Sequence, residues 1–185
     1  MKKTIYSLLT SLLIIAACSP AAPELPPPGE TITAFFDLMQ TGEYAEAQDL
    51  LFDGAPLPLN EVEEEFRGIF KNISYEIISE EVNGEEASVE LNISATDFAA
   101  VMEEIMAEAF YWIFEGITEN ELANRIETML LEKTASDTAP TTASYITVSL
   151  AAYEGQWQIV ADYEFADAIT GGLFSFAEYA GQWLN

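Results

Sequence analysis

The fold is decided by residues 73–95, which read ISYEIISEEVNGEEASVELNISA. Apolar residues alternate with polar ones at Ile73, Tyr75 and Ile77 before Asn83-Gly84, and after the turn the apolar positions run from Ala87 to Ala95. Strict alternation is typical of a strand that buries one face. An Asn-Gly pair favours the tight turn of a β-hairpin, because both residues tolerate positive φ. The stretch therefore predicts an antiparallel hairpin with one apolar face.

A second hairpin is predicted near the carboxyl end. Apolar residues alternate with polar ones from Tyr145 to Ala152, and Glu154-Gly155 provides a turn. The return strand is predicted to continue through Trp157, Ile159, Ala161 and Tyr163. We expect the two hairpins to pair into one antiparallel sheet.

Helical patterns surround these strands. Before the first hairpin, apolar residues recur at helical spacing over residues 33–39, 44–51 and 60–70. Between the hairpins lies a longer helical block. Its buried stripe is predicted to be Phe98, Val101, Met102, Ile105, Met106, Ala109 and Ile113. Thr118 and Glu121 form a capping box that starts the next helix.

The final segment, residues 165–185, reads as a helix broken near Gly171-Gly172. It is rich in aromatic residues and poor in charge, so one broad face must be hidden. We expect it to fold back as an intramolecular lid, and burial against another chain is the alternative. The predicted class is thus α+β: amino-terminal helices packed on a curved antiparallel sheet, with an inserted helical block and a carboxy-terminal helix.

The amino terminus carries a targeting pattern. Lys2 and Lys3 precede an apolar run that is too short to span a bilayer and that ends at Cys18. The segment Ile15-Ala16-Ala17-Cys18 resembles the lipobox of bacterial lipoprotein signal peptides. The resemblance implies that residues 1–17 are removed and that the Cys18 thiol carries diacylglycerol. Ordinary secretion, with Cys18 lost or left as a spectator, is the alternative.

These features predict three segments: a signal peptide over 1–17, a lipidated cysteine with a proline-rich spacer over 18–28, and a single α+β domain over 29–185. Five of the spacer residues are proline, which favours an extended chain that holds the domain away from the lipid. The expected location is a bacterial cell membrane or outer membrane, lipid-anchored, with the domain outside the cytoplasm.

Composition narrows the chemistry. Cys18 is the sole cysteine and the chain has no histidine, so thiolate nucleophiles, His-based triads and imidazole metal ligands are excluded. The net charge is −26, and it becomes −28 once Lys2 and Lys3 leave with the signal. Such a field repels nucleic acid, and a solvated acidic surface is a simpler interpretation than a cationic partner or divalent ions. We predict no nucleic-acid partner, no cofactor, no metal site and a monomer.

One further resemblance concerns the domain. The segment Thr41-Gly42-Glu43-Tyr44-Ala45-Glu46-Ala47 and the hairpin Tyr153-Glu154-Gly155-Gln156-Trp157-Gln158-Ile159-Val160 resemble small lipoproteins of the nuclear transport factor two-like superfamily, whose fold is cystatin-like. The resemblance covers residues 29–164. It implies a curved sheet wrapped around helices as a cone with an apolar interior. The helical block and the tail are additions that could fill or cover this cone.

Two functional interpretations follow. The first is a non-catalytic, membrane-anchored binding or scaffold domain for a small apolar ligand or an envelope protein. The second is an isomerase- or lyase-type enzyme that uses carboxylate and tyrosine groups on a small substrate, with Asp162 as a candidate base beside the strand tyrosines. No catalytic motif is matched residue by residue, which favours the first. The candidate pocket-lining residues are Tyr75, Tyr145, Trp157, Tyr163 and Trp183.

Overall fold

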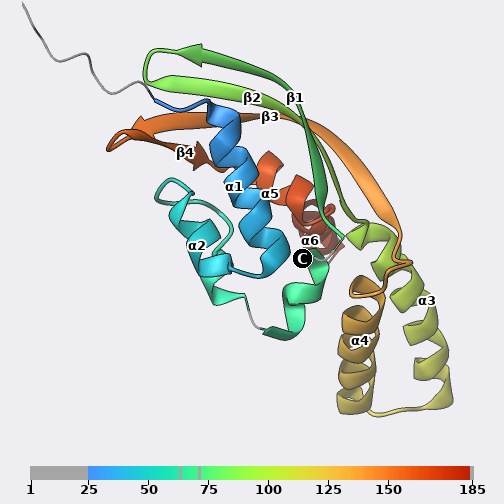
Figure 1. The fold of residues 1–185 in the computed structure, drawn as a ribbon. Coiled ribbons are helices and arrows are strands. Elements are labelled where there is room, and N and C mark those ends of the chain that lie inside the picture. The colour runs from blue at the N-terminus through green and yellow to red at the C-terminus, as the bar shows by residue number, and fades with distance from the viewer. Residues whose placement is uncertain (1–24, 63, 71, 184–185) are drawn as a thin grey trace, which may run out of the picture.

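The computed structural model describes residues 25–62, 64–70 and 72–183, and its centre is one curved antiparallel sheet (Figure 1). Its strands, in spatial order, are β1 (Ser74–Asn83), β2 (Glu86–Thr96), β3 (Thr141–Tyr153) and β4 (Gln156–Val160). Both predicted hairpins therefore lie in one sheet, and the α+β class is confirmed.

The alternation of the sequence sets the two faces of the sheet. Strands β2 and β3 pair along their whole shared length, from Glu86 opposite Ala151 to Thr96 opposite Thr141. Val89 and Ile93 are fully buried on the concave face, whereas the intervening polar residues point to the convex face. Because side chains alternate along a strand, this register places every apolar residue of β2 in the core.

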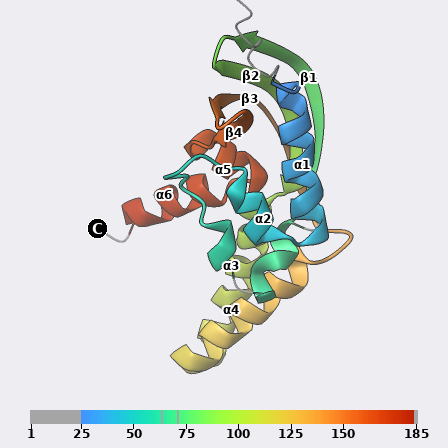
Figure 2. The same cartoon turned by 60° about the vertical axis from the view of Figure 1, so that its left-hand side comes forward.

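Helices cover the concave face (Figures 1 and 2). They are α1 (Pro28–Thr41) and α5 (Tyr163–Ile169), and α2 (Tyr44–Asp49) packs against α1. Helix α1 places Ile32, Phe35 and Phe36 against the sheet with no exposed surface. The Phe35 ring also meets the ring of Phe165 from α5, with 5.5 Å between centroids. The interior of the cone is thus filled with side chains.

The amino-terminal end of α1 is tied to the sheet by two hydrogen bonds. Pro28 opens α1, where its fixed φ and missing N–H suit the first helical turn. The indole N–H of Trp157 donates a 2.7 Å hydrogen bond to the carbonyl of Pro26, and the backbone N–H of Gly29 donates to a Glu80 carboxylate oxygen at 3.0 Å. Residues 26–29 are therefore held against the β1–β2 end of the sheet.

The inserted helical block is a helical hairpin that replaces the turn between β2 and β3. It consists of α3 (Phe98–Glu115) and α4 (Glu119–Thr134). Asp97 caps α3 by accepting a 2.9 Å hydrogen bond from the Ala100 N–H. The predicted capping box of Thr118 and Glu121 starts α4. In both views the α3–α4 hairpin projects from the pole opposite the β1–β2 turn.

The tail forms α5 and then α6 (Leu173–Trp183), and it bends at the two glycines predicted to break it. Gly171 has a φ of +61°, and a Cβ there would lie 1.7 Å from the Thr96 carbonyl oxygen. Only glycine fits this approach. The Phe176 ring of α6 contacts the Phe98 ring of α3, so the tail packs on its own chain.

Two elements of the structure differ from the sequence prediction. The helix expected over 60–70 is instead two 3₁₀ segments, η1 (Leu59–Glu61) and η2 (Glu64–Phe70), and 3₁₀ turns are common as connectors. The return strand was expected to reach Tyr163 but ends at Val160. Asp162 accepts a hydrogen bond from the Phe165 N–H and thereby starts α5, so the chain leaves the sheet there.

Among the described residues, no helix combines the length and apolar composition that crossing a bilayer requires.

Candidate functional site

The predicted pocket residues on the concave side belong to the packed interior. The ring of Tyr75 on β1 stacks on Phe36 with 4.3 Å between centroids. Trp157 on β4 is 1% exposed, and its indole N–H donates a hydrogen bond to the Pro26 carbonyl. Trp157 is therefore a buried, hydrogen-bonded core residue, and Tyr75 is a partly buried residue that packs against the core.

The remaining predicted residues lie elsewhere. Tyr145 is exposed on the convex face of β3, and Tyr163 is exposed at the start of α5. The Asp162 carboxylate caps α5 by accepting a hydrogen bond from the Phe165 N–H. Trp183 ends α6, but its side chain lies outside the described part of the chain, as does Cys18. The structure therefore does not bring the predicted tyrosines and Asp162 together around one cavity.

Tyr145 instead belongs to a polar cluster on the convex face. The Ser79 hydroxyl donates a 2.6 Å hydrogen bond to a Glu90 carboxylate oxygen, and the Tyr145 hydroxyl bonds the same side chain. These bonds lower the pKa of Glu90, with Ser79 as the larger cause. The hydrogen bond to Glu90 raises the pKa of Tyr145. Each group thus stabilises the ordinary ionisation state of the other, which is not the tuning that a general base needs.

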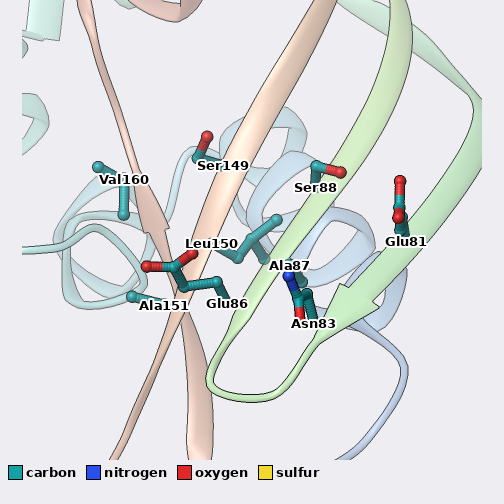
Figure 3. A pocket seen from close by; sticks show the side chains of 9 residues that line it. All are labelled: Glu81, Asn83, Glu86, Ala87, Ser88, Ser149, Leu150, Ala151 and Val160. Carbon is teal, nitrogen blue, oxygen red and sulfur yellow. The ribbon is translucent and has the colours of Figure 1, made fainter.

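A hollow of about 510 Å³ lies across the sheet near the β1–β2 turn (Figure 3). Its polar lining comes from three strands, with Glu81 on β1, Glu86 and Ser88 on β2, and Ser149 on β3. Figure 3 shows the oxygens of Glu86, Ser88 and Ser149 pointing in different directions. Because these groups do not converge, the hollow offers no catalytic constellation.

An apolar depression of about 450 Å³ lies between η2 and α6. It is lined by Leu57, Val62, Ile69, Phe70 and Leu173, together with Glu61 and Thr170. This lining is the type that takes a small apolar group. It is the described feature that best matches the predicted small-ligand site, although none of the predicted pocket-lining residues lines it.

The strongest exposed apolar feature is a row of side chains on α3, which we name the α3 stripe. Its members recur every three or four residues and thus share one side of the helix. They are Met106 (57% exposed), Phe110 (62%), Ile113 (57%) and Phe114 (76%). The rings of Phe110 and Phe114 contact each other edge to face at 4.9 Å. Such a cluster marks an interaction site more often than a scattered single residue does.

The α3 stripe corrects one expectation. Met106 and Ile113 were predicted to be buried, yet both are exposed. Helix α3 has two apolar faces: the face with Ile105 and Ala109 is buried, and the face with the α3 stripe has no partner among the described residues. The signal was present in the sequence, because the apolar arc of residues 98–114 is wider than one packed face requires.

The α3–α4 hairpin is also strongly acidic. Residues 98–134 contain eight glutamates and two basic residues, a net charge of −6. Both cations are engaged within the hairpin: Lys133 forms a salt bridge with Glu104, and the Arg125 guanidinium lies 5.3 Å from the centre of the Trp112 ring. The surroundings of the α3 stripe therefore carry uncompensated negative charge.

No group of three or more acidic, histidine or cysteine side chains among the described residues could hold a metal ion.

The fold is similar to that of a solved structure. No protein-family model matches the chain, and no curated protein matches it. Its structure is similar to the crystal structure of a candidate lipoprotein (ycdA) from Bacillus subtilis, with a TM-score of 0.46 and 16% sequence identity. The match covers 77% of this chain and 46% of the other, so it spans just under half of that structure.

Proposed function

We propose that this protein is a lipid-anchored bacterial lipoprotein whose extracytoplasmic domain is a non-catalytic binding module for another envelope protein. The location rests on Ile15-Ala16-Ala17-Cys18, and the binding role rests on the exposed α3 stripe. The proposed relation to the nuclear transport factor two-like superfamily is supported by helices that pack on the concave face of a curved antiparallel sheet.

The filled interior argues against storage of a ligand inside the cone. The side chains that a ligand would displace, including Phe35, Phe36 and Trp157, are at most 1% exposed. Protein interiors are packed about as densely as organic crystals, so a ligand would have to open the core first. The large apolar area offered to a partner lies outside the core, on α3.

Two other functions remain as alternatives. A small apolar ligand could occupy the depression between η2 and α6, whose apolar lining favours it. The tyrosine and carboxylate enzyme has weaker support, because its residues are spread over both faces of the sheet and the start of α5. Leu173→Gln would test the ligand alternative, since a polar group in the depression should weaken binding of a hydrophobic dye without unfolding the domain.

The anchor is tested by Cys18→Ala. We expect the wild-type chain to incorporate labelled fatty acid and to fractionate with membranes, because two or more acyl chains anchor stably. The variant should incorporate no label and move to the soluble fraction. A matched Ser19→Ala variant should behave as the wild type. If the wild type takes up no label, the lipoprotein assignment is wrong.

A further inference from the structure

We propose that the α3 stripe docks a basic amphipathic segment of another envelope protein, at the pole of the domain opposite the one where residues 26–29 meet the sheet. This proposal deepens the proposed function and rests on it, because it names the surface and the chemistry of the partner.

The first argument is the size of the α3 stripe. With about 180 Å² for each complete side chain, its four exposed residues present roughly 450 Å² of apolar surface. Patches of this size on single proteins are often functional. A stable interface buries about 800 Å² on each partner, with an apolar centre and a polar rim. The α3 stripe supplies such a centre, and the surrounding glutamates supply such a rim.

The second argument is charge. The hairpin carries −6, and its two cations already interact with Glu104 and Trp112. A partner with lysine or arginine beside its apolar residues would meet opposite charge at the rim, which steers encounter and selects against wrong partners. A second copy of this chain would bring two hairpins together that each carry a net charge of −6, so they would repel each other. The same repulsion disfavours an anionic membrane surface.

The third argument is position. Contacts from Trp157 and Glu80 hold residues 26–29 at the β1–β2 pole, so the chain from Cys18 enters the domain there. The α3–α4 hairpin projects from the other end of β2 and β3 (Figures 1 and 2). Eleven residues of β2 separate the two ends by roughly 35 Å. A protein partner that approaches from the side away from the anchoring membrane can therefore reach the α3 stripe.

A titration with defined peptides tests the chemistry of the partner. Full-length lipoprotein in phosphatidylcholine nanodiscs is titrated with an 18-residue leucine/lysine amphipathic helix and with the same helix carrying glutamate for lysine. We expect the lysine peptide to bind and the glutamate peptide to bind at least tenfold more weakly. The double variant Phe110→Ser, Phe114→Ser should weaken binding at least about 30-fold, which is the loss of one interface hot spot.

The control is Tyr153→Ser, which removes a half-exposed aromatic from the β3–β4 turn and should leave binding unchanged. Circular dichroism and thermal melting should show that all variants fold, since every replaced ring is exposed. Equal binding by the double variant and the wild type would mean that negative charge alone attracts the peptide, and would overturn the proposal. The same titration with the Cys18→Ala chain remains readable if lipidation fails, so the two proposals fail separately.

A second experiment identifies the partner segment in cells. A photo-crosslinking p-benzoylphenylalanine replaces Phe110 in one strain and Tyr153 in another, and the crosslinked peptide is mapped by mass spectrometry. A crosslink from position 110 to a basic amphipathic segment, absent from position 153, is the expected result. A crosslink to lipid, to a second copy of this chain or to an acidic segment would refute the proposal, and so would no crosslink above the control.

Discussion

Trp157 couples the core to the point at which the chain enters the domain, and its replacement should separate two contributions to stability. The side chain is 1% exposed, and its indole N–H donates a 2.7 Å hydrogen bond to the Pro26 carbonyl. Trp157→Ala removes the hydrogen bond and leaves a large cavity. Trp157→Phe removes the hydrogen bond and only part of the ring volume.

The expected magnitudes follow from these losses. Truncation of a buried tryptophan to alanine costs about 3–5 kcal/mol in the free energy of unfolding. The hydrogen bond contributes about 1 kcal/mol, so Trp157→Phe should cost about 1–2 kcal/mol with the loss of packing included. For a domain of this size each kcal/mol lowers Tm by about 2–4 °C, which gives a fall of roughly 6–20 °C for alanine.

Thermal melting and urea unfolding of the wild type and both variants would measure these costs. Trp112→Phe is the matched control, because Trp112 is only partly buried on α3 and contacts Arg125, so it should cost about 1 kcal/mol or less. The indole proton of Trp157 should also exchange slowly with solvent in the wild type. A near-neutral Trp157→Ala, or rapid exchange of that proton, would refute both the burial and the contact with Pro26.

Two further predictions use other contacts. Gly171→Ala should destabilise the protein by at least about 2 kcal/mol, because a Cβ at this positive φ would collide with the Thr96 carbonyl. The control is Gly84→Ala, which should cost only about 1 kcal/mol, because Gly84 has a similar φ but open space around it. Equal costs of the two variants in urea unfolding would contradict the close approach of Gly171 to Thr96. Tyr145→Phe should raise the pKa of Glu90 toward its ordinary value while the Ser79 bond keeps it partly lowered. The pKa of Glu90 is lower in the folded protein than in the unfolded chain, so ionised Glu90 stabilises the fold. This stabilisation is fully present above the unfolded pKa and is lost as pH falls through the folded pKa. A carboxyl NMR titration would check this, and an unchanged Glu90 pKa in Tyr145→Phe would exclude the hydrogen bond.

Much of the fold was predictable because it depends on neighbours along the chain. The pattern around Asn83-Gly84 predicts a strand pair, which is confirmed, and the alternation after the turn predicts the buried face of β2. The capping box of Thr118 and Glu121 was also correct, since both partners lie within one turn. The break at Gly171-Gly172 was found for the same reason, because positive φ is a local property of glycine.

The candidate site was predicted poorly, because convergence of side chains depends on contacts between distant segments. Tyr75 and Tyr145 were expected to line one pocket, yet they lie on opposite faces of the sheet. Period-two patterning assigns residues to two faces, but it does not say how closely helices will fill the concave face. Here α1 fills it with Phe35 and Phe36.

The sequence by itself determined the two hairpins and the capping box of Thr118 and Glu121, because each is encoded within a few consecutive residues. The lipid anchor at Cys18 stays a prediction from the sequence. Only the tertiary structure decided which apolar face of α3 is buried. Met106 and Ile105 are neighbouring apolar residues, but Ile105 is fully buried and Met106 is 57% exposed. Burial requires a second surface within contact distance, and only the path of the whole chain decides where that surface lies.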